Sequence, residues 1–155
     1  MPSKEDPVAV VATGGSDGAC AAAALLLRYP GAGLWVTSKH QCPHPLAALC
    51  RQEPRPARVL VCGVGLTEPP DEVFSALDAL RGQGVAVTWL CGRAYLARWA
   101  GALAGHCRTS LSDRGSNAAE AIALARLGRH ARAGLLAELG RQYARGERGD
   151  EEHAF

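Results

Sequence analysis

The sequence is constrained most by a run of small and β-branched apolar residues, Val8–Ala12, that leads directly into the glycine-rich segment 13–20. A run of this kind, without polar alternation, is typical of a strand buried on both faces of a parallel sheet. A glycine turn between such a strand and a helix is where open α/β folds bind ligands, because backbone N–H groups and the helix dipole converge there. The sequence therefore predicts an α/β fold with a ligand-binding loop at 13–20, where Asp17 is the only charged residue.

Apolar runs alternate with helix-patterned segments along the chain, and prolines and glycines separate them. Predicted strands cover residues 8–12, 34–37, 58–62 and 85–90. Predicted helices cover residues 19–28, 44–51, 71–81, 93–103, 117–127 and 130–145. This order predicts an α/β fold with a doubly wound, mostly parallel sheet and helices on both faces, closed by two C-terminal helices.

The length and composition of the chain indicate one globular domain. With 155 residues, 48% of them hydrophobic and 21% charged, the chain can bury about two thirds of its unfolded surface. We expect residues 1–145 to form the domain and residues 146–155 to form a flexible acidic tail. No apolar run approaches the roughly 20 residues that cross a bilayer, and the polar residues 1–6 resemble no targeting signal. The expected location is the cytoplasm.

The six cysteines are dispersed along the chain, with no C-x-x-C pair among them. Most lie in or beside apolar segments, so we expect reduced thiols that fill the core. An alternative is a zinc site that includes Cys42, His44 and Cys50, although Cys-Pro-His-Pro lacks the paired spacing of structural zinc motifs.

Positive charge is concentrated in the C-terminal half of the chain. Residues 91–145 hold nine arginines against three acidic residues. This segment is either a solvated helical face or a surface for an acidic partner or a nucleic acid. Trp35 and Trp89 lie in predicted strands and are assigned to the core. The candidate interface residues are Arg93, Tyr95, Trp99, Arg126, Arg129 and Arg132.

Four sequence motifs follow one another along the chain: T-G-G-S-D-G-A-C, R-V-L-V-C-G-V-G-L, V-T-W-L-C-G-R and S-D-R-G-S-N-A-A-E-A-I. From residue 8 to about residue 127 the chain resembles the DHH phosphoesterase domain of the RecJ family. In that family the first motif reads H-x-D-x-D-G, the second ends a strand in Asp, the third is Asp-His-His, and a further Asp precedes the closing helices. These residues hold two divalent metal ions, typically manganese, that activate water against a phosphodiester.

The resemblance places most of the family's metal ligands at positions that have lost them. Two acids remain, Asp17 in the first motif and Asp113 in the fourth. The positions without the family's ligand are Thr13, Gly15, Gly63, Cys91, Gly92 and Arg93. Two adjacent divalent ions need several carboxylates around them, and an arginine at the position of a metal-binding histidine adds positive charge instead. The expectation is a pseudoenzyme with no catalytic residues, no bound metal and no cofactor.

A DHH domain without its metal ligands resembles the non-catalytic RecJ homologue that joins GINS and the MCM ring in archaeal and eukaryotic replicative helicases. Some archaeal forms of that subunit are similar to this chain in having a lone DHH-type domain. The resemblance implies a subunit of the archaeal CMG assembly that binds GINS and supports DNA unwinding by MCM during DNA replication. It also leaves room for a weak contact between the basic segment and single-stranded DNA.

Two enzymatic functions remain as alternatives. The segment T-G-G-S-D-G also resembles the S-G-G-x-D-S pyrophosphate loop of ATP pyrophosphatases, in which backbone amides and hydroxyls bind phosphates; here Gly18 replaces the final Ser. The second alternative is a metal-dependent single-strand exonuclease with an unusual ligand set. His40, His44 and His106 are available bases. None of them has a carboxylate at a sequence spacing that would indicate a catalytic pair, so each is assigned to a loop or the surface.

Asp17 and Asp113 also have a purely structural interpretation. Each precedes or opens a predicted helix, where a carboxylate accepts backbone N–H bonds and interacts favourably with the helix dipole. For Asp17 we expect this capping role, which requires no ligand.

Overall fold

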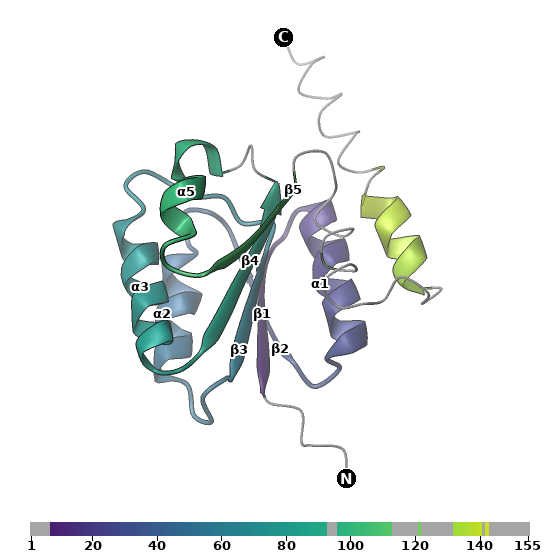
Figure 1. Ribbon diagram of the computed structural model, residues 1–155. Helices are drawn as coiled ribbons and strands as arrows, with labels where there is room; N and C mark the ends of the chain where they lie inside the picture. The colour runs from purple at the N-terminus through teal and green to yellow at the C-terminus, as the bar shows by residue number, and fades with distance from the viewer. Residues whose placement is uncertain (1–6, 93–95, 113–120, 122–131, 141, 143–155) are drawn as a thin grey trace.

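The computed structural model describes residues 7–92, 96–112, 121, 132–140 and 142. Within them, five strands form one sheet in which every neighbouring pair is parallel, in the order β2-β1-β3-β4-β5 (Figure 1). The strands are β1 (Val8–Thr13), β2 (Gly33–Thr37), β3 (Arg58–Cys62), β4 (Ala86–Gly92) and β5 (Arg108–Ser112). The named helices are α1 (Ser16–Arg28), α2 (Pro43–Arg51), α3 (Asp71–Gly82), the short 3-10 helix η1 (Ala97–Trp99) and α5 (Ala100–Leu103).

Helices cover both faces of the sheet (Figure 1). α2, α3 and α5 lie on one face, and α1 and the helical residues 132–140 lie on the other. Alternate residues of each central strand enter the two cores, so that Val11 and Trp89 pack on the α3 side and Val10 and Leu90 pack on the α1 side. All four are fully buried. The continuous apolar runs of the sequence thus reflect strands that are buried on both faces.

The predicted α/β class and doubly wound parallel sheet are confirmed. All four predicted strands are present, and residues 58–62 form a strand with the predicted bounds. The predicted helices at 44–51 and 71–81 are each one residue longer in the structure. Residues 132–140 are helical, inside the range predicted for the last helix. The remainder of the closing helices and the predicted tail lie outside the described residues.

Three local features differ from the prediction. The helix α1 begins at Ser16 rather than Ala19, because the N–H of Ala19 already donates to the carbonyl oxygen of Gly15 at 2.8 Å. Residues 97–103 form a short 3-10 helix followed by the four-residue α5. Glycines at 101 and 105 disfavour a longer helix. The sequence pattern does not predict strand β5, because its short and polar sequence R-T-S-L-S carries no apolar run.

Within the described residues, no helix combines the length and the hydropathy that a membrane span requires.

Candidate functional site

The motif positions of three strands lie in one row at the carboxyl edge of the sheet. Strands β1, β3 and β4 are its three central members. Ala12 pairs with Cys62, and Cys62 pairs with Leu90. The next residue on each strand is Thr13, Gly63 or Cys91, and neighbouring strands are about 4.8 Å apart. The parallel topology therefore brings together three positions that are up to 78 residues apart in the numbering, from 13 to 91.

The second motif position is built around glycine. Gly63 has a φ of 70°, in the left-handed region that favours glycine over residues with a Cβ atom. Its N–H donates to the carbonyl oxygen of Leu90 at 2.8 Å, which fixes the chain where β3 ends beside β4. The left-handed backbone conformation at position 63 thus favours the glycine that occupies it. Glycine has no side chain that could bind a metal ion.

The first turn of α1 packs tightly on the end of β1. Asp17 is buried, with 9% of its surface exposed. A Cβ atom at Gly18 would overlap the Thr13 hydroxyl and would lie 3.3 Å from the Thr13 carbonyl oxygen. Gly18 is therefore explained by close approach of the helix to the strand end, whether or not a ligand binds.

The predicted capping role of Asp17 needs correction. The N-cap residue of α1 is Gly15, which has no side chain to make a capping hydrogen bond. Asp17 lies one residue inside the helix, because the helix begins earlier than the sequence pattern indicated. Its carboxylate remains in the first turn, where negative charge interacts favourably with the helix dipole.

Asp17 also lies within electrostatic range of two thiols. Burial is the main cause that raises the pKa of the Cys91 thiol to about 12, and the Asp17 charge adds to the effect. The pKa of Cys20 is raised by the same two causes. Burial likewise raises the pKa of Cys62 to about 12, and its neighbour Cys91 adds to it. The thiols at this edge are therefore neutral at physiological pH.

These residues do not fit a pair of divalent metal ions. Hard divalent cations prefer oxygen ligands, and a two-metal site needs several carboxylates. The row offers the Thr13 hydroxyl, a glycine and a protonated thiol, with Asp17 as the carboxylate of the neighbouring turn. Among the residues that the structure describes, no group of three or more His, Cys, Asp or Glu side chains could hold a metal ion. The fourth-motif Asp113 lies outside those residues, as does Arg93.

The predicted interface residues are only partly covered by the structure. Arg93, Tyr95, Arg126 and Arg129 lie outside the described residues. Arg132 is exposed at the start of the helical segment 132–140. Trp99 is half-buried: its ring makes an edge contact with Phe74, with centroids 6.4 Å apart, and the Arg98 guanidinium lies 4.8 Å from its centroid. Trp99 thus packs partly on the core and leaves part of its surface open.

The described cysteines and tryptophans bear out the core assignment in most respects. All six cysteines are free, and Cys42, Cys62 and Cys91 are buried. Among the described residues, Cys42 does not join His44 and Cys50 in a metal-binding cluster. Trp89 is fully buried and its indole N–H donates to the carbonyl oxygen of Val64 at 2.9 Å. Trp35 is partly buried against the same core.

The histidines divide into two kinds. His40 and His44 are exposed, as predicted. His106 has a partner that the sequence did not indicate: its Nδ1 lies 2.7 Å from Oδ1 of Asp78, and its ring stacks on Phe74 with centroids 4.3 Å apart. Since 28 residues separate His106 from Asp78, only the tertiary fold reveals this pair.

An exposed apolar strip on β2 is a further surface that the sequence analysis missed. Leu34 is 48% exposed and Val36 is 68% exposed. They pair with Val10 and Ala12, so both project on the α1 side of the sheet. A Cβ atom at Gly14 would lie 3.8 Å from Cγ1 of Val36, which places the strip beside the glycine loop. The sequence identifies this strand but does not show that it forms an edge.

Comparison with known proteins gives several remote structural likenesses. No family model and no curated protein matches the chain. RecJ from Thermus thermophilus, crystallised with Mn2+, is similar over 79% of this chain and 19% of its own, with 15% identity and a TM-score of 0.49. The sugar isomerase domain of an RpiR transcription factor from Sphaerobacter thermophilus is similar over 96% of this chain and 79% of its own, with 16% identity and a TM-score of 0.45.

This chain thus spans about a fifth of the RecJ chain that it matches. Both TM-scores lie below 0.5, and neither likeness assigns a family or an activity to this chain.

Proposed function

We propose that this chain is a cytoplasmic, non-catalytic DHH-type subunit that binds GINS and supports DNA unwinding by MCM in an archaeal replicative helicase. The observation that carries the proposal is the row of Thr13, Gly63 and Cys91 at the carboxyl edge of three adjacent strands. The sequence motifs align these residues with metal-ligand positions of the RecJ family. A hydroxyl, a glycine and a buried thiol can maintain the turns at the strand ends, but they cannot hold the two metal ions that phosphodiester hydrolysis needs.

Without the metal ligands, the function that we infer is binding of another protein at the surface rather than catalysis in the pocket. The exposed strip of Leu34 and Val36 supports this part of the proposal, because apolar side chains on an edge strand favour contact with another protein. Trp99 and Arg132 are the described members of the candidate interface, and both have exposed surface.

Co-expression with the GINS complex tests the partner. The expected result is a stoichiometric complex that survives size-exclusion chromatography. Val36→Asp should weaken the complex if the β2 strip takes part, whereas Ala79→Asp serves as a control because Ala79 is also exposed but lies on α3, on the other face of the sheet. A chain that remains monomeric in the presence of GINS contradicts the proposed partner.

A nuclease assay tests the absence of catalysis. Incubation with single-stranded DNA and manganese should give no degradation. Degradation that disappears in Asp17→Ala would establish a working metal site and overturn the pseudoenzyme. A rise in melting temperature with millimolar ATP that also depends on the loop 13–20 would favour the pyrophosphatase alternative.

A further inference from the structure

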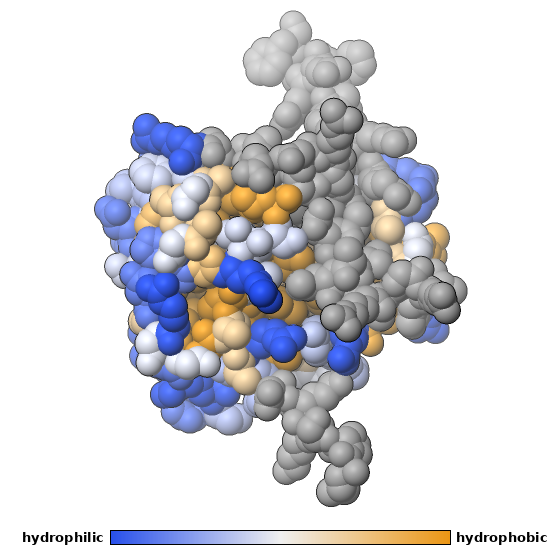
Figure 2. All heavy atoms as spheres, in the orientation of Figure 1, coloured by the Kyte–Doolittle hydropathy of each residue, from blue (hydrophilic) through white to orange (hydrophobic). Residues whose placement is uncertain are grey.

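A cavity of about 490 Å³ lies at the opposite end of the sheet from the glycine loop. It is formed where β3, β4 and β5 begin and where α1 and α3 end. Its size is that of a pocket for a small molecule. In the space-filling view, strongly hydrophilic residues lie across an apolar hollow on the face beside β5 (Figure 2). The residues that carry the inference are Tyr29, Arg58, Leu60, Thr88 and Arg108.

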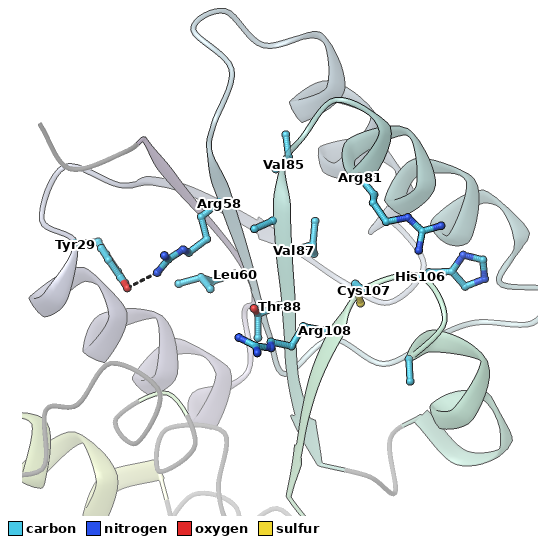
Figure 3. Close-up of a pocket in the computed structure, with 12 residues that line it drawn as sticks. Tyr29, Arg58, Leu60, Arg81, Val85, Val87, Thr88, His106, Cys107 and Arg108 are labelled. Atoms are coloured by element: carbon cyan, nitrogen blue, oxygen red, sulfur yellow. Dashed lines mark hydrogen bonds between the residues drawn. The ribbon is translucent and has the colours of Figure 1, made fainter. Parts of the chain in front are cut away.

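The register of the sheet places polar groups around an apolar floor. Arg58 pairs with Ala86, Leu60 pairs with Thr88, and Thr88 pairs with Arg108. Because paired residues of parallel strands project on the same side, these side chains all lie on the α1 face. Figure 3 shows Leu60 and Thr88 between the side chains of Arg58 and Arg108. The two arginines start on strands that are separated by β4, a distance of about 10 Å.

The positive charge of the two arginines is not neutralised by the surrounding described residues. Arg58 donates to the Tyr29 hydroxyl at 2.9 Å, and its guanidinium lies 5.9 Å from the Tyr29 ring centroid. Arg108 makes no ion pair with a described residue. The third arginine of the wall, Arg81, differs because it pairs with Asp78 at 3.1 Å. The cavity therefore presents two available guanidinium groups, the side chain best suited to phosphate oxygens.

Thr88 adds a polar side chain to the wall of the cavity between the two arginines. It is one of only three buried polar or charged residues among those described, with 9% of its surface exposed. Its hydroxyl makes no hydrogen bond within the described part of the chain, although it lines the cavity. Among the described residues, only Gln83 Oε1 and Trp99 Nε1 are fully buried without a hydrogen-bond partner, so the Thr88 hydroxyl is open to the cavity, where it can bond to a ligand as a valine could not. A bound acceptor or donor would explain the hydroxyl.

We propose that this cavity binds the phosphate group of a phosphorylated small molecule. Arg58 and Arg108 bind the phosphate oxygens, the Thr88 hydroxyl completes the polar contacts, and the less polar part of the ligand lies on Leu60 and Ala86, which share this face of the sheet. The site is separate from the loop 13–20 and from the proposed partner surface. It is therefore independent of the proposed function.

Isothermal titration calorimetry of the full chain tests this site with pyrophosphate, AMP and adenosine. Pyrophosphate and AMP should bind saturably, and adenosine, which lacks phosphate, should bind at least tenfold more weakly than AMP. Arg108→Gln should weaken AMP binding at least tenfold, and Arg58→Gln should have a similar effect. Arg51→Gln is the matched control, because it makes the same charge change on α2, on the opposite face of the sheet.

Thr88→Val separates binding from folding. This variant should weaken AMP binding while the melting temperature of the free protein rises or stays unchanged. Unchanged affinity in Thr88→Val, or equal loss of affinity in Arg51→Gln and Arg108→Gln, overturns the proposed site. Binding of neither pyrophosphate nor AMP at millimolar concentration overturns it as well. Saturable binding of single-stranded oligothymidylate without binding of AMP would show a nucleic-acid surface instead and would also overturn the proposal.

Discussion

Gly18 illustrates how a single residue position is determined by the approach of two elements. The first turn of α1 lies so close to the end of β1 that a Cβ atom would overlap the Thr13 hydroxyl. Thr13 is β-branched and has few alternative rotamers, so it cannot easily move away. The glycine is thus explained by packing, although it also belongs to a motif that resembles a catalytic loop.

Gly18→Ala should therefore destabilise the protein by about 1–3 kcal/mol through overpacking. Gly101→Ala is the control, because Gly101 lies within α5 and a Cβ atom there meets nothing within 4 Å; it should stabilise the protein by about 0.5–1 kcal/mol. Urea denaturation followed by circular dichroism measures both changes. Equal effects of the two substitutions would contradict the close approach at Gly18.

The buried thiols predict an alkaline limit to stability. Burial raises the pKa of Cys42, Cys62, Cys91 and Cys107 to about 12, whereas a thiol in the unfolded chain has a pKa of about 8.5. Above that pH the unfolded state loses protons that the folded state keeps, so the free energy of unfolding falls as pH rises toward 12. Each thiol contributes a slope of about 1.4 kcal/mol per pH unit in this range.

Urea denaturation from pH 7 to pH 10.5 measures this slope. The free energy of unfolding should show little thiol-dependent change below about pH 8 and should fall above it. Cys62→Ala should reduce the alkaline slope by about 1.4 kcal/mol per pH unit. The same slope in the wild-type protein and in the variant would show that the Cys62 thiol ionises equally in both states.

At the scale of elements, the helical segment 132–140 completes the second core. Ala133 is fully buried within the cluster on the α1 side, and Leu136 and Ala137 pack against that cluster. Leu135 projects the other way and is 62% exposed. The spacing of these residues gives the segment one buried and one exposed face, as expected for a helix packed on a sheet.

Two substitutions within this segment should differ in their effect on the free energy of unfolding. Ala133→Asp should destabilise the protein by more than about 3 kcal/mol, because it buries a charge without a partner. Leu135→Asp should change the free energy of unfolding by less than about 0.5 kcal/mol, because the residue faces solvent. Thermal denaturation of both variants provides the comparison. Similar melting temperatures would mean that the segment does not pack as described.

The strand β5 and the β2 edge show what element patterns leave undetermined. β5 escapes prediction because a short polar edge strand is held by hydrogen bonds to β4 rather than by an apolar run. The run Leu34–Thr37 predicts β2, but its position at the other edge follows only from the strand order. The exposure of Val36 depends on that order.

At the scale of the whole molecule, one sheet joins the two apolar cores. Trp89 belongs to the core on the α3 side, and Leu90, the next residue, belongs to the core on the α1 side. Neither core can be exposed without disturbing the strands that both share. The molecule should therefore unfold as one cooperative unit.

Urea titration should give coincident transitions by two probes. Tryptophan fluorescence reports chiefly on the α3 side, where all three tryptophans pack, and far-ultraviolet circular dichroism reports on the helices of both faces. Midpoints that differ between the probes, or a second transition, would contradict a single cooperative unit.

The α/β class follows from local sequence alone, because continuous β-branched runs at 8–12, 58–62 and 85–90 require strands that are buried on both faces. Local sequence also identifies the glycine loop and the motif positions on three strands. Local pattern is sufficient for such features, because each depends on residues close together in the chain.

The way in which these elements meet is visible only in the folded chain. Parallel pairing brings Thr13, Gly63 and Cys91 into one row, and the same register places Arg58 and Arg108 around a cavity at the opposite end of the sheet. Strand order, edge position and the approach of helix to strand are set by long-range packing. The sequence pattern records which face each residue prefers, but not which distant residue it will face.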